Sequence, residues 1–306
     1  MSIRTTIKPL GWLSTAAVAI GLLAGCGTSN ASIVATYNGG TVTQSQLDTQ
    51  VHIEQLLYPS LNVTTAVKKQ ILNEIIVYDR LLYAKAVAAG IKIPQSTIDN
   101  TVLQWKQGEI SQTFQGNSQN FDAKLQSLNL TENDISSLIG VQLTLQAYSQ
   151  TLVKSIPIAQ AKTYYQQNLA NFATVTERAI LVKTLPLAQK VQKLLLAGGS
   201  WNTLAKQYSQ DPGSKNNGGE YANQNPTQWV TPFKDHAMTQ PIGQIGAPFN
   251  STYGYFVMEV LKRTIAPFNQ VQSQINSQIA PQQASTAISN LALQLQKTAN
   301  ITVTLS

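Results

Sequence analysis

The most constraining feature of this sequence is the stretch from Thr176 to Arg263, which begins and ends with β-type runs. The run from Thr176 to Lys183 has the alternation typical of a strand with one buried face. The stretch has about 90 residues, the size of a small domain. Its expected elements are a strand at 176–183, helices at 187–197 and 201–208, a turn-rich loop at 211–219, an aromatic patch at 229–233, and apolar runs at 245–249 and 253–260. This order of strands and helices predicts an α+β module.

Five short motifs within this stretch are informative about its family. They are Ala179-Ile180-Leu181-Val182, Tyr208-Ser209-Gln210-Asp211-Pro212, Gly218-Gly219-Glu220-Tyr221, Pro232-Phe233 and Tyr253-Gly254-Tyr255-Phe256-Val257. In this order they resemble the parvulin family of peptidyl-prolyl isomerases. The resemblance implies a parvulin-like domain at residues 174–266, in which helices surround a small antiparallel sheet.

The resemblance also implies roles for individual residues. Phe233 falls on the family's proline-pocket phenylalanine, and Trp229 and Met238 fall on two further pocket positions. These three are therefore the expected substrate-binding residues. Asp211 occupies the position of a catalytic cysteine or aspartate, and Ser251 that of a small hydroxyl residue. The alternative is that Phe233, Trp229 and Met238 are ordinary core residues of a small module.

Two histidines of the family's site are missing. Ala179 stands at the first histidine position and Phe256 at the second. The histidines of this sequence, His52 and His236, lie elsewhere and are expected to be surface or helix-packing residues. The missing imidazoles favour binding without turnover, whereas the apolar slot with Asp211 favours an isomerase.

Prolyl isomerisation needs little chemistry from a protein. Rotation about a peptide bond faces a barrier of roughly 18–20 kcal/mol, and no covalent bond is made or broken. A catalyst needs an apolar slot for the proline ring and a site that favours the twisted amide. We therefore expect no cofactor, no metal and no nucleophile. The single cysteine and two histidines make no zinc site, and Gly218-Gly219 lacks the Lys-Ser/Thr pair of a phosphate loop.

The N-terminus has the pattern of an export signal. Two basic residues precede an apolar run, 10–24, that is short for a membrane-spanning helix. Its end, Leu23-Ala24-Gly25-Cys26, resembles a bacterial lipobox. This implies a signal peptide at 1–25, lipidation of Cys26, a tether at 26–32 and a place on the outer face of the bacterial cytoplasmic membrane. An ordinary signal peptide with a chance cysteine is the alternative.

The segments on either side of the module are predicted to be mainly helical. Asn38-Gly39-Gly40, between two β-type runs, is a hairpin signal. The best amphipathic helix runs from Thr64 to Ala89, with Gly90 as its C-terminal cap. Further expected elements are a helix from about residue 43 to Pro59, helices at 95–112, 120–128, 131–153 and 157–171, a C-terminal helix kinked or split at Pro281, and a final strand at 301–305.

The apolar positions of these flanking helices resemble the chaperone domain of SurA- and PrsA-type foldases. The matching segments are 71–76, 81–82 and 88–91. The resemblance implies that residues 33–173 and 267–306 form one discontinuous, mostly helical chaperone domain, with the parvulin-like domain inserted into it.

Composition narrows the expected partners. Only 11% of residues are charged, and removal of Arg4 and Lys8 with the signal lowers the net charge from +7 to about +5. No basic cluster with interleaved aromatic residues suggests nucleic acid. The expected partners are unfolded or newly secreted polypeptides with X-Pro bonds and, through Cys26, the membrane; homodimerisation stays open. Few carboxylates and missing histidines together suggest the hypothesis of an acidic extracellular habitat.

Three functions are compatible with these patterns. The first is an exported foldase with a prolyl isomerase module, and the second is a non-catalytic chaperone that holds unfolded chains. The third is a generic substrate-binding lipoprotein, which would need a larger chain of alternating strands and helices than this sequence shows. We favour the foldase role and leave open whether turnover survives the loss of the histidines.

Overall fold

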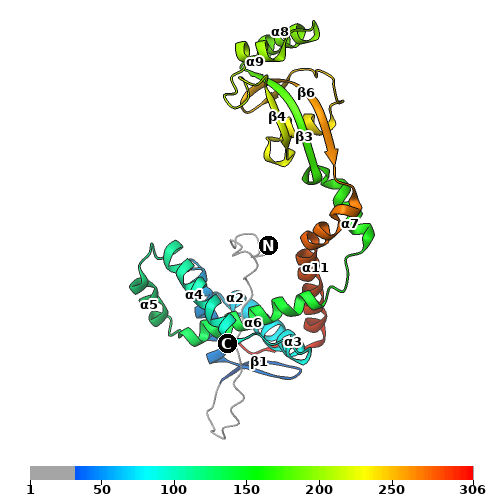
Figure 1. Cartoon of the computed structure of the whole chain (residues 1–306). Coiled ribbons are helices and arrows are strands. Elements are labelled where there is room, and N and C mark those ends of the chain that lie inside the picture. Colours follow the sequence, from blue (N-terminus) through cyan, green and yellow to red (C-terminus); the bar gives the residue numbers. More distant parts are fainter. Residues whose placement is uncertain (1–31, 306) are drawn as a thin grey trace. The chain divides into compact units, whose positions relative to one another are not determined.

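The computed structural model describes residues 32–305, which form two compact units (Figure 1). The first unit comprises residues 32–155 and 280–305, and the second is Ile156–Ile279. The predicted signal peptide, Cys26 and the tether up to residue 31 lie outside the described residues. The predicted α+β class is confirmed, because helices surround two small antiparallel sheets.

The first unit is a helical body with one small sheet. Its elements are β1 (Ile33–Tyr37), β2 (Gly40–Thr43), α1 (Gln44–Leu57), α2 (Thr65–Glu74), the π-helix η2 (Ile75–Leu82), α3 (Tyr83–Ala88), α4 (Gln95–Gln112), α5 (Ser118–Ser127), α6 (Glu132–Thr151), the end of α11 (Phe268–Thr298) and β7 (Thr302–Val303). Strand β1 lies between β2 and β7 and is antiparallel to both. The predicted hairpin is therefore confirmed, and the last strand of the chain joins the first.

Local sequence signals set the helix ends in this unit. Thr43 forms a capping box with Gln46 at the start of α1, and Thr131 forms one with Asp134 at the start of α6, as predicted for that pair. The helix predicted from Thr64 is the continuous run α2–η2–α3. It ends just before Gly90, which has the positive φ, +82°, that a glycine cap adopts.

The middle of this run, η2, buries charged side chains. Asp79 and Arg80 are 2% and 7% exposed. Burial raises the pKa of Asp79 well above its usual range; the charge of Arg80 opposes this rise, while Glu74 and Glu54 add to it. Burial also raises the pKa of Glu54, on α1, to about 7, and the charge of Glu74 contributes in the same direction. The unit therefore contains carboxyl groups that favour the protonated state.

The second unit is built on a four-stranded antiparallel sheet in the order β4-β3-β6-β5. Its elements are α7 (Ile158–Gln167), the short 3-10 helix η3 (Leu169–Phe172), β3 (Ala173–Val182), α8 (Leu185–Leu196), α9 (Trp201–Tyr208), β4 (Glu220–Gln224), the 3-10 helix η4 (Pro226–Gln228), α10 (Thr231–Thr239), β5 (Phe249–Ser251), β6 (Gly254–Ile265) and the start of α11. The two long strands, β3 and β6, pair along their length and lie side by side in Figure 1.

Helices cover both faces of this sheet. On one face, α8 and α9 pack over Ile180, Val182 and Val257. On the other face, α10 packs over a second buried set, which we call the α10 cluster. Its members are Val175, Ala179, Phe233, Ala237, Phe249, Phe256, Met258 and Val260. The sheet is thus a two-sided core, and the α10 face carries the predicted pocket residues.

Helix α7 and the first part of α11 pack with the second unit. Ala161 and Phe172 are buried against Val271, Ile275 and Ile279 in one apolar cluster. Helix α11 continues through Pro281, so the split considered there does not occur, although a proline at this position cannot donate the usual backbone hydrogen bond. The domain boundaries expected at 174 and 266 lie inside the compact unit and stay a prediction.

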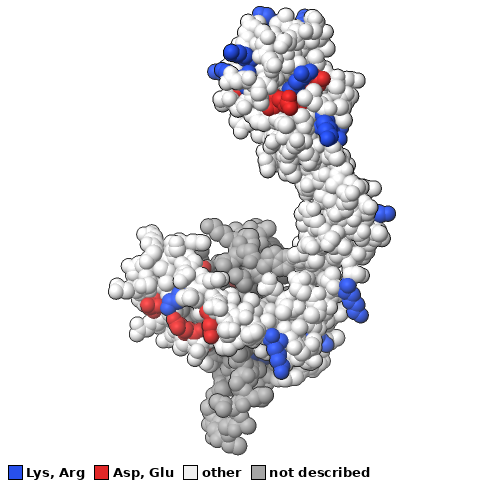
Figure 2. Space-filling view, viewed as in Figure 1, with Lys and Arg blue, Asp and Glu red and all other residues white. Residues whose placement is uncertain are grey.

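Charged side chains are sparse on the face drawn in Figure 2, in keeping with a chain in which 11% of residues are charged. Amide side chains contribute polar contacts on helices instead: Gln44 donates to Asp48, Gln70 to Glu74 and Gln95 to Asp99, each four residues apart. Within residues 32–305, no helix combines the length and apolar character that crossing a membrane requires.

Candidate functional site

The predicted pocket phenylalanine is a packed member of the α10 cluster. Phe233 is 6% exposed, and its ring meets those of Trp229, Phe249 and Phe256 in edge-to-face geometry, at centroid distances of 5.0, 6.1 and 4.8 Å. Such T-shaped contacts are a favoured arrangement of aromatic rings. The ring of Phe233 therefore supports the sheet from the interior, which agrees with a core-packing role.

The other two predicted pocket residues border this cluster. Trp229 and Met238 are half-buried and pack against it, together with Leu181 and Val230. The structure thus brings all three predicted substrate-binding residues into one cluster. An apolar ligand on this face would meet the partly exposed Trp229, Met238 and Leu181 rather than the ring of Phe233.

The two positions without histidine are both buried in the α10 cluster. Phe256 is 8% exposed, and its ring packs on Phe233. The backbone N–H of Ala179 donates to the carbonyl of Gly219 over 2.9 Å. A Cβ atom at Gly219, which has φ +80°, would overlap the Ala179 carbonyl. The loop that ends at Gly219 therefore lies directly against β3.

Asp211 organises this same loop. Its carboxylate accepts hydrogen bonds from the backbone N–H of Gly213 at 3.1 Å, from the Tyr221 hydroxyl at 2.9 Å and from the Ser214 hydroxyl. The Ser209 hydroxyl in turn accepts from the backbone N–H groups of Asp211 and Leu181. A carboxylate held by several donors stays in one orientation, so Asp211 is a fixed negative group on the loop.

Ser251 lies in a different turn. Its hydroxyl donates to the carbonyl of Gly254 at 3.0 Å and accepts from the N–H of Tyr253 at 3.1 Å, which closes the β5–β6 connection. The hydrogen bonds of Ser251 and those of Asp211 share no partner in the described chain. The structure therefore places these two residues, both predicted as catalytic, in separate hydrogen-bonded turns.

The two histidines lie in different units. His236, on α10, stacks on Phe249 with ring centroids 3.9 Å apart, and burial lowers its pKa. His52 is a half-buried residue of α1. His236 therefore occupies a helix-packing position.

Sequence reasoning missed a buried carboxyl on the central strand. Glu177 is fully buried, and neither of its carboxyl oxygens has a hydrogen-bond partner in the structure. Burial raises its pKa well above the usual range, and the negative charges of Asp211 and Glu220 raise it further. The signal was present in the alternation of β3, where Glu177 stands between the inward positions Val175 and Ala179.

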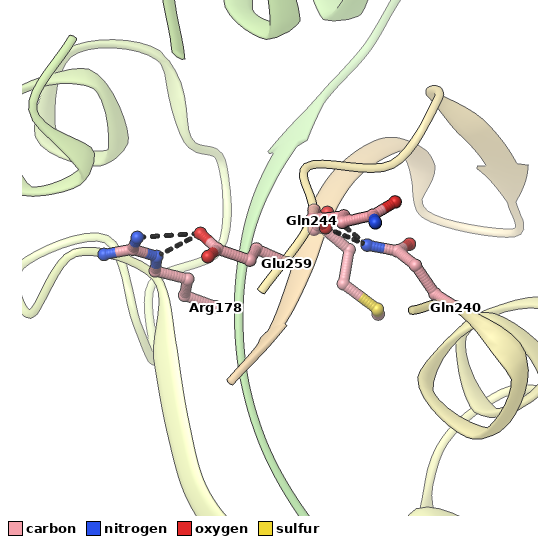
Figure 3. A network of polar contacts seen from close by, with 5 residues as sticks. Arg178, Gln240, Gln244 and Glu259 are labelled. Atoms are coloured by element: carbon pink, nitrogen blue, oxygen red, sulfur yellow. Dashed lines mark hydrogen bonds and ion pairs between the residues drawn. The ribbon is translucent and has the colours of Figure 1, made fainter. Parts of the chain in front are cut away.

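The neighbouring arginine points to the other face of the sheet. Arg178 donates to one carboxylate oxygen of Glu259, the residue opposite on β6, at 2.7 and 2.9 Å (Figure 3). Its guanidinium also lies 4.7 Å from the centre of the Trp201 ring. On the α10 side, the amide of Gln240 donates to the carbonyls of Gln244 and Met258. Arg178 therefore pairs with Glu259 and not with Glu177.

In the described part of the chain, no group of three or more His, Cys, Asp or Glu side chains is placed to hold a metal ion. The candidate site is thus a border of half-buried apolar side chains, connected through Leu181 to the loop that holds Asp211.

This chain is similar in sequence to one known domain family and to several known proteins. Residues 163–264 match the family model of the PPIC-type PPIASE domain. Foldase protein PrsA of Clostridium tetani is 25% identical over 270 residues, which cover 81% of this chain and 79% of that protein. Foldase protein PrsA of Clostridium kluyveri is 26% identical over 301 residues, covering 89% and 88%. The crystal structure of peptidylprolyl isomerase PrsA from Bacillus cereus covers 91% of this chain and 96% of its own, with 22% identity and a TM-score of 0.46.

Residues 163–264 of the second unit are thus similar to the PPIC, or parvulin, type of peptidyl-prolyl isomerase domain, the class that their motifs predict. The resemblance extends beyond the module, since the PrsA relatives align along most of the chain. The chain therefore resembles PrsA foldases and contains a parvulin-like module, and the resemblance predicted from the sequence is confirmed.

Proposed function

We propose that this protein is an extracytoplasmic foldase, which binds unfolded secreted polypeptides and accelerates the isomerisation of their X-Pro bonds. The observation that carries the proposal is the apolar border of Trp229, Met238 and Leu181 in a module that matches the PPIC-type PPIASE domain. The names of the PrsA relatives support the wider foldase role.

The border suits the chemistry of amide rotation. Half-buried apolar side chains can remove the proline ring from water, and the edge-to-face rings of the α10 cluster keep that surface rigid. The twisted amide has lost its resonance, so an apolar surface that fits it better than the planar forms lowers the barrier. Asp211 would orient the substrate backbone from the loop. No step in this scheme makes or breaks a covalent bond.

A protease-coupled assay on a proline tetrapeptide tests the isomerase activity. Trp229→Ala should lower the catalysed rate by about tenfold, or about 1.4 kcal/mol, which is just under the roughly 1.5–3 kcal/mol for full burial of an apolar side chain, because Trp229 is already half-buried without the peptide. The matched control is Leu196→Ala, which removes a side chain that is 63% exposed on α8 and should leave the rate unchanged. Equal rates with and without the protein would exclude catalysis.

A non-catalytic chaperone is the second candidate. Two observations favour it: the ring of Phe233 is nearly sealed, and buried Ala179 and Phe256 stand at the histidine positions. This candidate predicts that the protein suppresses aggregation of an unfolded secreted protein while the proline assay shows no acceleration. Acceleration that Trp229→Ala lowers by about tenfold would contradict it.

We further propose that the mature protein is anchored by a lipid on Cys26, at the outer face of the cytoplasmic membrane. The support is the lipobox-like segment that ends at this residue. Wild-type protein should be found in the membrane fraction of expressing bacteria and should carry a covalently attached lipid, and the Cys26→Ala variant should carry none. A covalently attached lipid in that variant would contradict the proposal.

A further inference from the structure

Glu177 lies on β3, the strand to which the loop of the candidate site is hydrogen-bonded, and its environment is unusual for a carboxyl group. It is fully buried in the central strand β3, and no hydrogen bond in the structure reaches either carboxyl oxygen. Its cross-strand neighbours are Tyr221 on β4 and Val260 on β6. An ionised carboxylate without a partner is very costly in such a place, whereas a neutral carboxylic acid is tolerated.

The charges that act on Glu177 are negative. Asp211, on the loop, and Glu220, at the start of β4, both disfavour its ionised form. The hydroxyl of Tyr221 faces the same group but donates to Asp211. No cation compensates from its own strand, because Arg178 pairs with Glu259.

The remaining charged groups near this face are also engaged elsewhere. On β6, the guanidinium of Arg263 donates to the backbone carbonyls of Ala237 and Gln240. On α10, Lys234 lies 3.8 Å from Asp235, and His236 stacks on Phe249. These contacts leave Glu177 without an ion-pair partner among the described residues.

The segment from Ser209 to Gly219 is docked on β3, the strand that carries Glu177. The N–H of Gln210 donates to the carbonyl of Leu181 at 2.8 Å, and the carbonyl of Gly219 accepts from Ala179. Between these two anchors, the segment carries Asp211. A second negative charge at Glu177 would repel Asp211 and weaken the docking.

We propose that Glu177 is a positioning residue of the candidate site: its uncharged carboxylic acid allows the segment 209–219, with Asp211, to dock on β3. Ionisation of Glu177 releases the segment, so a proline-containing peptide binds best below the pH at which Glu177 ionises. Only molecules with protonated Glu177 are competent, and the apparent affinity falls by about tenfold for each pH unit above that point. The effect on peptide binding rests on the proposed function, whereas the protonation state of Glu177 does not.

The proposed role of Glu177 is tested by infrared spectroscopy and peptide binding, both measured on the full protein between pH 5 and pH 10. The wild-type spectrum at pH 7 should contain the carbonyl band of a protonated carboxylic acid that is missing in Glu177→Gln. Tryptophan fluorescence measures the affinity for a proline tetrapeptide. This affinity should stay constant over the pH range in which the band persists and should fall over the range in which the band disappears. Glu177→Gln should bind with constant affinity throughout. Glu220→Gln alters an exposed neighbour, and in this variant the affinity for the peptide should still fall at the pH at which the carbonyl band of Glu177 disappears.

The outcomes separate the two proposals. Absence of the band from wild type at pH 7, or a constant affinity while the band disappears, overturns the role of Glu177. A fall in affinity in Glu177→Gln that matches the wild type also overturns it. If the band is present and affinity follows it, but the protease-coupled assay shows no acceleration, the isomerase function fails and the positioning role stands.

Discussion

Replacement of Glu54 by glutamine should remove a large pH dependence from the stability of the first unit. Glu54 lies on α1, where the amide of Gln50 donates to its carboxyl at 3.3 Å. Burial is the main cause that raises its pKa from the ordinary 4.5 to about 7, and the charge of Glu74 adds to it. Glutamine has nearly the same shape, keeps the acceptor for Gln50 and has no charge to lose, so the variant isolates the effect of ionisation.

The sign and size follow from linkage. A carboxyl whose folded pKa lies above its unfolded pKa stabilises the fold below the unfolded value, and this contribution is lost as the pH rises through the folded value. For Glu54 the stabilising contribution is therefore lost between pH 4.5 and about pH 7. Since one pKa unit corresponds to 1.36 kcal/mol, the wild type should lose about 3 kcal/mol relative to Glu54→Gln between pH 4 and pH 8.

Urea unfolding of both proteins at pH 4 and pH 8 measures this difference. The control is Glu132→Gln, which alters an exposed carboxyl on α6 whose ion pair with Lys106 is also near the surface. It should change the free energy of unfolding by less than about 1 kcal/mol at either pH. If wild type and Glu54→Gln differ by the same amount at pH 4 and pH 8, the buried carboxyl of Glu54 does not titrate as described.

Three further predictions follow from the packing, and one follows from the composition. Phe233→Ala should destabilise the second unit by about 3–5 kcal/mol in urea unfolding, because it empties the α10 cluster; a loss below about 1 kcal/mol would show that the ring is not core. Gly219→Ala should cost more than Gly90→Ala, although both have φ near +80°, since only at Gly219 would a Cβ meet the backbone of Ala179; equal costs would refute this. Thr131→Ala should cost about 1 kcal/mol through loss of the α6 cap, visible as a lower urea midpoint, and no change would mean that the capping box contributes nothing. The acidic-habitat hypothesis predicts no loss of stability as the pH falls to about 3, and marked unfolding between pH 5 and pH 4 would contradict it.

Much of the secondary structure was determined by short-range patterns. The helix predicted at 95–112 has those bounds as α4, and the predicted pairing of Thr131 with Asp134 is the cap of α6. Asn38-Gly39 forms the turn of the predicted hairpin, with Gly39 at positive φ. Such features depend on residues a few positions apart, which is why the sequence alone determines them.

The candidate site was only partly accessible from sequence. The motifs placed Phe233, Trp229 and Met238 together, but burial of the Phe233 ring depends on Phe249 and Phe256, which arrive from β5 and β6. No local pattern reports how closely strands and helices from distant parts of the chain approach one another. Solvent exposure of a pocket residue is therefore a tertiary property.

The protonation states were decided by the tertiary structure as well. In the sequence, Glu54, Asp79 and Glu177 resemble ordinary surface carboxyls, and only Glu177 stands in the inward phase of a strand. Their pKa values rise because the fold removes water and brings other carboxyls near them, from Glu74 in the first unit and from Asp211 and Glu220 in the second. Sequence determined the elements and the family resemblance. The assembled sheet and helices decided which side chains lost their water, because desolvation depends on neighbours that are distant in sequence.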